Sequence, residues 1–426
     1  MTATTTAVSD ATGMESVDSF RLRAREWIPA NLRRLADLPA DERAQRNLSS
    51  DESAWQRARA LQRTLYEGGF AGICYPEEYG GLGLTPAHQR AFNEEVTDYE
   101  MPMLLNVPTF TICGPTILDM GSEEQKREHL AAAIRGDEVL VQFLSEPGGG
   151  SDLAGGTTRA ERDGDVFVLN GSKIWSSGAY AADYALCLAR TDWDAPKHRG
   201  LTMFLMKVHQ PGVHIERIKQ VNGGDEFCQE FFDDVVVPAS AVVGEVGGGW
   251  AVASRQLFHE RNAVGGGSPY FSGARAEGRR GTETDPLIDL VRRTGRADDP
   301  YARELIAEAH ALGVIHGHLV DRVTAGMRTQ KMPPAAGSLI RLFHGESATR
   351  QAEIALELAG PAAAMSAPDG PDTREVGVSF LFRQAEQLGG GSTEMARNII
   401  SERILGMPRE YAADRDVPFN QVRHGR

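Results

Sequence analysis

Two glycine- and serine-rich runs hold most of the residues in this chain that could bind a ligand through the backbone. The first is SEPGGGSD at 145–152, which follows a strand-like apolar stretch from Val139 to Leu144. Its proline and three successive glycines end that stretch, and Ser151 and Asp152 are suited to capping a turn or helix. Such a loop lets a polyanion or a flat ring approach the main chain closely.

The second run, NGSKIWSSG at 170–178, presents a planar ring and two hydroxyls. Trp175 offers a flat face, and Ser176 and Ser177 beside it can donate or accept hydrogen bonds. Each run alone is a weak signal, because a glycine-rich turn between strands more often only reverses the chain. The informative feature is the order and spacing of the two runs together.

Length and charge limit the class of protein. The chain has 426 residues, enough for roughly three domains, and 41% of them are apolar, so a sizeable core can form. The formal net charge is -14 and there is no basic run. This charge balance argues against nucleic acid as a partner, because phosphate contacts need clustered Lys and Arg.

Cysteine usage and the amino terminus predict a cytoplasmic protein. The four cysteines have no CxxC pair and no accompanying histidine spacing, so we expect neither a metal site nor a disulfide framework. Residues 1–15 are polar and rich in Thr and Ala, without a basic start or an apolar core, and are expected to form a disordered tail rather than a signal peptide. No apolar stretch approaches the roughly 20 residues that a membrane span requires.

The periodicity of apolar residues divides the rest of the chain into three zones and predicts an α+β fold. Residues 16–138 show the three- and four-residue spacing of helices. Residues 139–246 contain short β-prone runs separated by Gly, Asp and Pro, which suit an antiparallel barrel or sandwich. Residues 247–426 return to helical spacing over runs long enough to pack as a bundle.

These features resemble the acyl-CoA dehydrogenase family, and the resemblance extends in the family's order over most of the chain. Besides the two glycine-rich runs, it rests on four segments: FAGICYPEEYGGLGLTPAHQRAFNEEV at 70–95, MGSEEQKREHLAAAIRGDEV at 120–139, VVVPASAVVGEVGGGW at 235–250 and GGGSTEMARNIISERILG at 389–406. The resemblance implies an N-terminal helical domain, a middle antiparallel β-barrel domain and a C-terminal four-helix bundle.

The resemblance also implies a reaction and a cofactor. Family members remove two hydrogens from an acyl thioester to give the trans-2-enoyl product: a base takes the α-proton, and the flavin of FAD takes a hydride from the β-carbon. Protein side chains cannot accept a hydride, so the flavin is essential. The family's flavin contacts fall on residues of the two runs, namely Gln142, Leu144, Ser145, Gly150, Ser151, Trp175 and Ser177. Ser151 also lies where the family contacts the acyl thioester.

The position of the base departs from the commonest family pattern. Many members carry a glutamate just before a Gly-Thr pair at the start of the last core helix, and that position here is Gly390. A second family arrangement places the glutamate on the first helix of the C-terminal bundle, before an arginine. Glu260 and Arg261 match this arrangement, so Glu260 is the expected base. Without the resemblance, a Glu beside an Arg would more often be a solvated surface pair.

Further residues of the GGGST run match family roles. The thioester carbonyl is held in the family by a backbone N–H at the position of Gly390, and a main-chain donor survives replacement of the side chain. Gly391, Ser392 and Glu394 match flavin contacts, although Ser392 is also suited to a simple N-cap role. Arg261 and Gly390 join Ser151 as expected substrate contacts.

Two departures bear on cofactor occupancy and assembly. The family usually has an Arg followed by Phe-Gly between the first two bundle helices, whereas RRTGRADD at 292–299 lacks the Phe-Gly, and Arg293 is only a possible substitute. Glu357 replaces a family glutamine before the Gly-Gly loop, and an acidic residue near a pyrophosphate is unfavourable. Some family members form tetramers of two different chains, in which not every subunit keeps all the cofactor contacts.

Three hypotheses follow. The first is an FAD-dependent acyl-CoA dehydrogenase with Glu260 as base, either a homotetramer or the catalytic chain of a mixed tetramer, with an electron-transfer flavoprotein as acceptor. The second is a non-catalytic partner subunit of such a mixed tetramer. The third is a flavin oxidase or monooxygenase on the same scaffold. The acyl group stays open, as does the choice between coenzyme A and a carrier-protein thioester.

Overall fold

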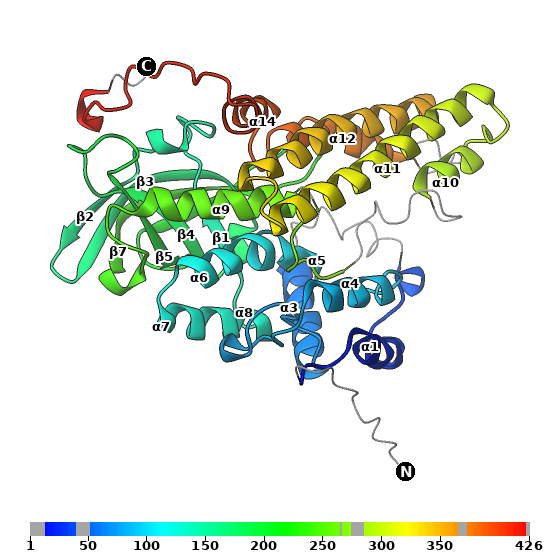
Figure 1. Cartoon of the computed structure of the whole chain (residues 1–426), viewed down its shortest axis with the longest axis horizontal. Coiled ribbons are helices and arrows are strands. Elements are labelled where there is room, and N and C mark those ends of the chain that lie inside the picture. The colour runs from blue at the N-terminus through cyan, green and yellow to red at the C-terminus, as the bar shows by residue number, and fades with distance from the viewer. Residues whose placement is uncertain (1–12, 40–51, 265, 274–284, 365–372, 423–426) are drawn as a thin grey trace, which may run out of the picture.

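The structure, a computed structural model, describes residues 13–39, 52–264, 266–273, 285–364 and 373–422. Helices come first, a sheet follows, and helices return at the end of the chain (Figure 1). The α+β architecture of helical domain, β domain and helical bundle expected from the sequence is therefore confirmed. Most of the expected disordered tail, residues 1–12, lies outside the described residues. Glu15 at the end of that segment is anchored, because it forms an ion pair with Arg23 at 3.0 Å.

The N-terminal helices pack around a cluster of aromatic rings. Phe70 stacks on Phe92 with 5.3 Å between ring centroids, and Phe20 meets Phe70 edge-on at 5.5 Å. The helices of this part are α1 (Val17–Asn31), α3 (Glu52–Glu67), α4 (Pro86–Glu95), α5 (Met103–Leu105), the π-helical η3 (Asn106–Cys113), α6 (Gly114–Met120), α7 (Glu123–Gln125), the π-helical η4 (Lys126–Leu130) and α8 (Ala131–Arg135).

The middle part is an eight-stranded sheet. Its strands are β1 (Leu140–Phe143), β2 (Arg159–Asp163), β3 (Val166–Ser177), β4 (Tyr184–Arg190), β5 (Leu201–Lys207), β6 (Val213–Arg217), β7 (Phe227–Pro238) and β8 (Val242–Val243). They pair in the order β6-β7-β3-β2-β4-β5-β8, and β1 pairs with β4. Most pairs are antiparallel, as expected, but β1 runs parallel to β4 over four residue pairs, so the sheet is mixed. β1 enters from the helical part, and its direction is not set by a hairpin.

The C-terminal helices are organised around one long helix. α12 contacts α9, α10, α11, α13 and α14, so the expected four-helix bundle is extended by shorter helices. The bounds of these helices are α9 (Gly249–Val264), α10 (Pro286–Arg293), α11 (Pro300–Arg328), α12 (Gly337–Ala359), α13 (Arg374–Phe382), the single turn η11 (Ala385–Gln387), α14 (Thr393–Ile399) and the π-helical η12 (Ile400–Ile404).

Helix α9 joins the three parts. It contacts η3 and α6 of the N-terminal helices, β5 of the sheet, and α12 of the C-terminal helices. Figure 1 shows it lying across the sheet and reaching toward the long helices. α9 is therefore the helix at which the three parts of the molecule meet. The chain beyond η12 returns to the sheet, where the fully buried ring of Phe419 lies 3.4 Å from the Arg190 guanidinium.

Candidate active site

Glu260 and Gln256 lie one turn apart on α9, and both contact the side chain of Gln142 on β1. The Gln256 amide Nε2 donates to Gln142 Oε1 at 3.1 Å. The Gln142 side chain also lies close enough to Glu260 to favour its ionised carboxylate, and its amide nitrogen is the group that can interact with that negative charge. Gln256 is fully buried, and its Oε1 has no hydrogen-bond partner among the described residues.

The turn before α14 brings Gly390 to the same carboxylate. The Gly390 backbone N–H lies close enough to Glu260 to favour its ionised carboxylate, although the two residues are far apart in the sequence. Gly390 has φ +75°, which glycine adopts without strain. A Cβ at this position would lie 2.9 Å from Val264 Cγ2, so the turn fits closely against the end of α9. The structure thus brings together Glu260, Gln142 and Gly390, three of the residues singled out in the sequence.

Glu260 is half-buried, and the surrounding protein desolvates its carboxyl. This desolvation raises the pKa of the carboxyl, and the charge of Arg261 together with the nearby Gln142 side chain and Gly390 N–H opposes that rise. The net direction is upward, so burial outweighs the favourable contacts. Burial also lowers the pKa of Arg261, and the negative charge of Glu260 opposes this change. The surface pair that a Glu-Arg sequence usually forms is therefore not what the fold builds here.

A β-bulge exposes the ring of Trp175. The pairing of β3 with β7 shifts between Ile174 and Ser176, and Trp175 between them has φ +68°. The bulge turns the indole outward, where 55% of the residue is exposed, while Ser176 is buried. A large exposed aromatic ring on a strained backbone is what a flat ligand would cover. Ser177, two residues further, is half-buried at the end of β3.

The two glycine-rich runs lie side by side. The Ile174 N–H donates to the Ser145 carbonyl at 3.0 Å, so the first run continues next to the bulged part of β3. Beneath them, Lys173 Nζ lies 2.8 Å from Glu146 Oε1 and both side chains are buried. Glu146 also accepts hydrogen bonds from the backbone N–H groups of Thr157 and Thr158. This fully bonded pair fixes one run against the other.

The remaining residues of the first run differ in exposure. Leu144 is buried, Ser145 is half-buried, and Gly150 and Ser151 are exposed. A Cβ at Gly150 would lie 3.8 Å from Ser145 Oγ, so these two residues are close. The loop therefore presents a small residue and two hydroxyls, and its Ser145 is bonded to Ile174, the residue before Trp175.

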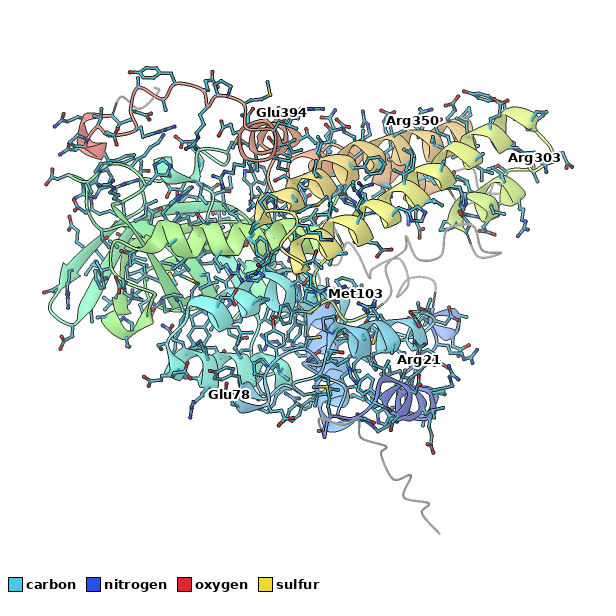
Figure 2. All side chains as sticks on the ribbon, viewed as in Figure 1. Arg21, Glu78, Met103, Arg303, Arg350 and Glu394 are labelled. Carbon is cyan, nitrogen blue, oxygen red and sulfur yellow. The ribbon has the colours of Figure 1, made fainter. Side chains whose placement is uncertain are left out.

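The residues after Gly390 begin α14. Ser392 is its N-cap, and its hydroxyl accepts from the Met395 N–H at 3.2 Å, as expected for the simpler of its two roles. Gly391 is exposed, and the Glu394 side chain, labelled in Figure 2, is 73% exposed. A chain of aromatic contacts joins Trp175 to the C-terminal helices. The Trp175 ring meets the Phe227 ring edge-on, and the Phe227 ring stacks with that of Phe382 on α13 at 6.5 Å.

Arg293 and Glu357, the two residues at which the sequence departs from the family pattern, each bind another side chain of the same protomer. Arg293 forms an ion pair with Asp289 one turn earlier on α10, at 2.9 Å. Glu357 accepts a hydrogen bond from the Tyr301 hydroxyl at 2.5 Å. Glu357 is thus already bonded within the protomer.

Sequence reasoning missed several residues that hold the site together. Gln256 could have been found, because it precedes Glu260 by one helical turn on the same face. Glu146 and Lys173, which pair across the two glycine-rich runs, are not marked by residue type or by local pattern. Arg341 on α12 donates to the Gly389 carbonyl, and nothing in its local sequence marks it.

Comparisons with known proteins agree with this geometry. Three family profiles match in succession: the acyl-CoA dehydrogenase N-terminal domain over residues 30–137, the middle domain over 142–235 and the C-terminal domain over 247–405. The acyl-CoA dehydrogenase IpdE1 of Mycobacterium tuberculosis is 35% identical over 406 residues, covering 93% of this chain and 99% of the relative. The chain belongs to the acyl-CoA dehydrogenase family.

Solved structures of acyl-CoA dehydrogenases share the fold. The Tcur3481-Tcur3483 steroid acyl-CoA dehydrogenase superposes with a TM-score of 0.76 and 29% identity, covering 95% of this chain and 99% of that one. A chain of the ChsE4-ChsE5 complex from Mycobacterium tuberculosis gives 0.70 and 25%, over the same shares of the two chains. The family membership and the enzyme class expected from the sequence are thereby confirmed.

The structure also describes the cysteines, the possible metal ligands and the longer helices. All four cysteines, Cys74, Cys113, Cys187 and Cys228, are free thiols. Within the described residues, no group of His, Cys, Asp or Glu is arranged to hold a metal ion. Among the helices that are described, none is long and apolar enough to cross a membrane.

Proposed function

We propose that this acyl-CoA dehydrogenase uses FAD to convert an acyl-CoA thioester to the trans-2-enoyl-CoA, with Glu260 as the base that takes the α-proton. The observation that carries the proposal is the meeting of Glu260, Gln142 and the Gly390 amide. Bound FAD would supply the acceptor for the β-hydride, which no side chain can provide. A positioned base contributes about 10²- to 10⁴-fold in rate.

The residues around the bulge fit a flavin. Trp175 gives an exposed ring, and Ser145, Ser151 and Ser177 of the same two glycine-rich runs give hydroxyls. Hydroxyls, backbone amides and an aromatic face are the groups that flavin carbonyls, ring nitrogens and phosphates require. We assign FAD binding to Gln142, Leu144, Ser145, Gly150, Ser151, Trp175, Ser177, Gly391, Ser392 and Glu394.

The substrate contacts follow from the position of the carboxylate. Glu260 can take the α-proton only while it is ionised. Arg261 and Gln142 favour the ionised carboxylate and so increase the fraction of Glu260 that can act as base. The Gly390 N–H beside it is a donor for the thioester carbonyl as negative charge develops on that oxygen. Ser151 and Arg261 complete the proposed substrate contacts.

The assembly and the electron acceptor are part of the same proposal. We assign the chain to a homotetramer or to a mixed tetramer with a related chain, and an electron-transfer flavoprotein to the role of acceptor. The ChsE4-ChsE5 relative is a complex of two chains, which supports the mixed form. The two alternatives, a non-catalytic partner subunit and a flavin oxidase or monooxygenase, predict different behaviour of the purified chain.

Anaerobic mixing of the purified protein with a panel of acyl-CoAs tests the proposal. The panel includes straight-chain, branched and steroid-derived thioesters, the last because one similar structure is a steroid acyl-CoA dehydrogenase. Bleaching of the flavin absorbance together with an enoyl product supports the dehydrogenase. A colourless chain that binds FAD only with a co-expressed relative would instead indicate a partner subunit. Hydrogen peroxide or a hydroxylated product under air would indicate the third alternative.

A further inference from the structure

A buried arginine on α12 binds the backbone of the turn that contains Gly390. Arg341 lies on α12 and has no exposed surface. Its Nε donates to the Gly389 carbonyl at 3.0 Å, and its Nη2 donates to the carbonyls of Glu386 at 2.8 Å and Gly389 at 2.6 Å. Nη1 has no hydrogen-bond partner in the part of the chain that the structure describes. A fully buried guanidinium is costly, so its retention requires a specific interaction.

Two glycines make room for this guanidinium. Gly345 follows Arg341 by one turn of α12, and a Cβ there would lie 2.7 Å from Nη1. A Cβ at Gly390 would lie 3.3 Å from the Arg341 Nε. The space beside Gly390, where many family members carry the catalytic glutamate, is thus occupied in part by an arginine. The turn and the helix fit each other only with small residues at both positions.

The positive charge of Arg341 also acts on Glu260. It favours the ionised carboxylate and opposes the upward shift of the Glu260 pKa that burial causes. Burial lowers the pKa of Arg341 itself, and the charges of Glu386 and Glu260 oppose that change. The other groups facing Glu260 are Arg261 on its own helix and the Cys113 thiol on η3, whose pKa burial raises.

We infer that Arg341 is a positioning residue of the active site, which holds the Gly389–Gly391 turn so that the Gly390 N–H faces Glu260 and which balances the negative charge there. The inference rests on the proposed role of Glu260 as base. When Glu260 takes the α-proton, negative charge moves from its carboxylate to the thioester oxygen. Arg341 holds the Gly389 carbonyl next to the Gly390 N–H, and its charge acts on Glu260, so it would remain near the moving charge throughout the transfer.

Exchange of the α-hydrogen with D₂O tests the inference independently of hydride transfer. The probe is the acyl-CoA that the wild type dehydrogenates fastest, and exchange is followed by NMR across pH with the flavin reduced beforehand by dithionite. We expect Arg341→Met to slow exchange on the order of 10²-fold, as misplaced catalytic groups do. In the plot of exchange rate against pH, the fall in rate on the acid side (the acidic limb) should also move to higher pH in this variant, because the carboxylate loses a stabilising charge. FAD content should be unchanged.

Three further variants separate position from charge. Arg341→Lys keeps the charge without the forked donors, so its acidic limb should stay near that of the wild type while the rate remains low. Gly345→Ala displaces the guanidinium without removing it and should lower the rate with little movement of the limb. Arg350→Met removes an exposed arginine farther along α12 (Figure 2), where it pairs with Glu308 at 2.6 Å, and should change neither property.

The outcomes distinguish this inference from the proposed function. If Glu260→Gln still exchanges the α-hydrogen, the assignment of the base is wrong. If Glu260→Gln is inactive but Arg341→Met exchanges at the wild-type rate with an unmoved limb, only the role of Arg341 is overturned. A rate that falls equally at every pH in Arg341→Met, with no movement of the limb, would reduce Arg341 to a structural residue. Should Arg341→Met fail to fold, Arg341→Lys and Gly345→Ala decide by the same criteria.

Discussion

The carboxylate of Glu260 is destabilised by the fold around it. Its pKa is raised by burial in the folded chain, so its ionisation weakens the folded state as pH rises through that pKa. Active sites commonly hold such groups at a cost in stability. The kcat/KM of the enzyme should therefore fall on the acid side at a pH above that of an ordinary glutamate, because only the ionised form accepts a proton.

The pair of Glu146 and Lys173 has the opposite effect on stability. Burial raises the pKa of Glu146, but the Lys173 charge and hydrogen bonds from Lys173, Thr157 and Thr158 overcome this and bring it to about 2. The stabilisation is thus present above the pKa of an unfolded glutamate, near 4.3, and is lost as pH falls toward 2.

Glu146→Gln tests this pair. We expect a lower thermal midpoint at pH 7, since Lys173 is left buried without its carboxylate, with a loss on the order of 3 kcal/mol. The midpoint of the wild type should drop between about pH 4.5 and 2. That drop should be smaller in the variant when both are followed by circular dichroism. An equal drop in the two proteins would show that other carboxylates control acid stability.

At the scale of elements, strands and helix ends can be predicted from the types and spacing of neighbouring residues. The run YALCLAR forms β4, Tyr184–Arg190, because an aromatic residue followed by apolar residues extends over the length of a strand and is bounded by turn residues. α3 ends at Glu67, just before Gly68 and Gly69, because adjacent glycines stop a helix. The direction of β1 could not be read, because it depends on pairing with a strand more than 40 residues away.

The site was readable only in part. Glu260 was chosen through the family resemblance, since a Glu-Arg pair alone favours the surface. Arg341 escaped notice because its partners, Glu386 and Gly389, are brought to it by tertiary packing. The exposure of Trp175 depends on a bulge that no residue type announces, because a tryptophan is unusual at positive φ.

The close packing of the Gly390 turn predicts that a glutamate at position 390 cannot serve as the base. Moving the base to the commoner family position, with Gly390→Glu in a Glu260→Gln background, should not restore dehydrogenation. The glutamate at position 390 would be held at a backbone φ of +75°, which is strained for a residue with a Cβ. Its Cβ would also lie too close to the side chains of Val264 and Arg341. Flavin reduction by acyl-CoA measures the outcome. Gly406→Ala, at φ +67° with open space around it, controls for backbone strain alone. Recovery of reduction in the double variant would contradict the packing argument.

At the scale of the molecule, several large apolar side chains of the C-terminal helices are exposed. Val314 and Ile315 on α11 are 44% and 50% exposed, Leu381 on α13 is 45% exposed, and no residue of α13 is buried. Large exposed apolar side chains on a helical face indicate contact with another chain. This agrees with the proposed tetramer.

Light scattering tests the assembly. The wild type should have a mass well above the 46.3 kDa of one chain, alone or with a co-expressed relative. Ile315→Glu should lower that mass, because burying an unpaired carboxylate at an interface is unfavourable. Leu22→Glu, at an apolar residue 61% exposed on α1, is the matched control and should leave the mass unchanged. A wild type that remains a monomer in both settings would rule the tetramer out.

The rate of anaerobic flavin reduction by acyl-CoA, compared between the wild type and Glu260→Gln, tests the central claim most directly. The variant should bind FAD normally and should fold at least as stably, because it lacks a carboxylate that burial disfavours. Its reduction rate should nevertheless fall by about 10²- to 10⁴-fold. Reduction within a few-fold of the wild type would contradict the account, because the α-proton would then have another acceptor.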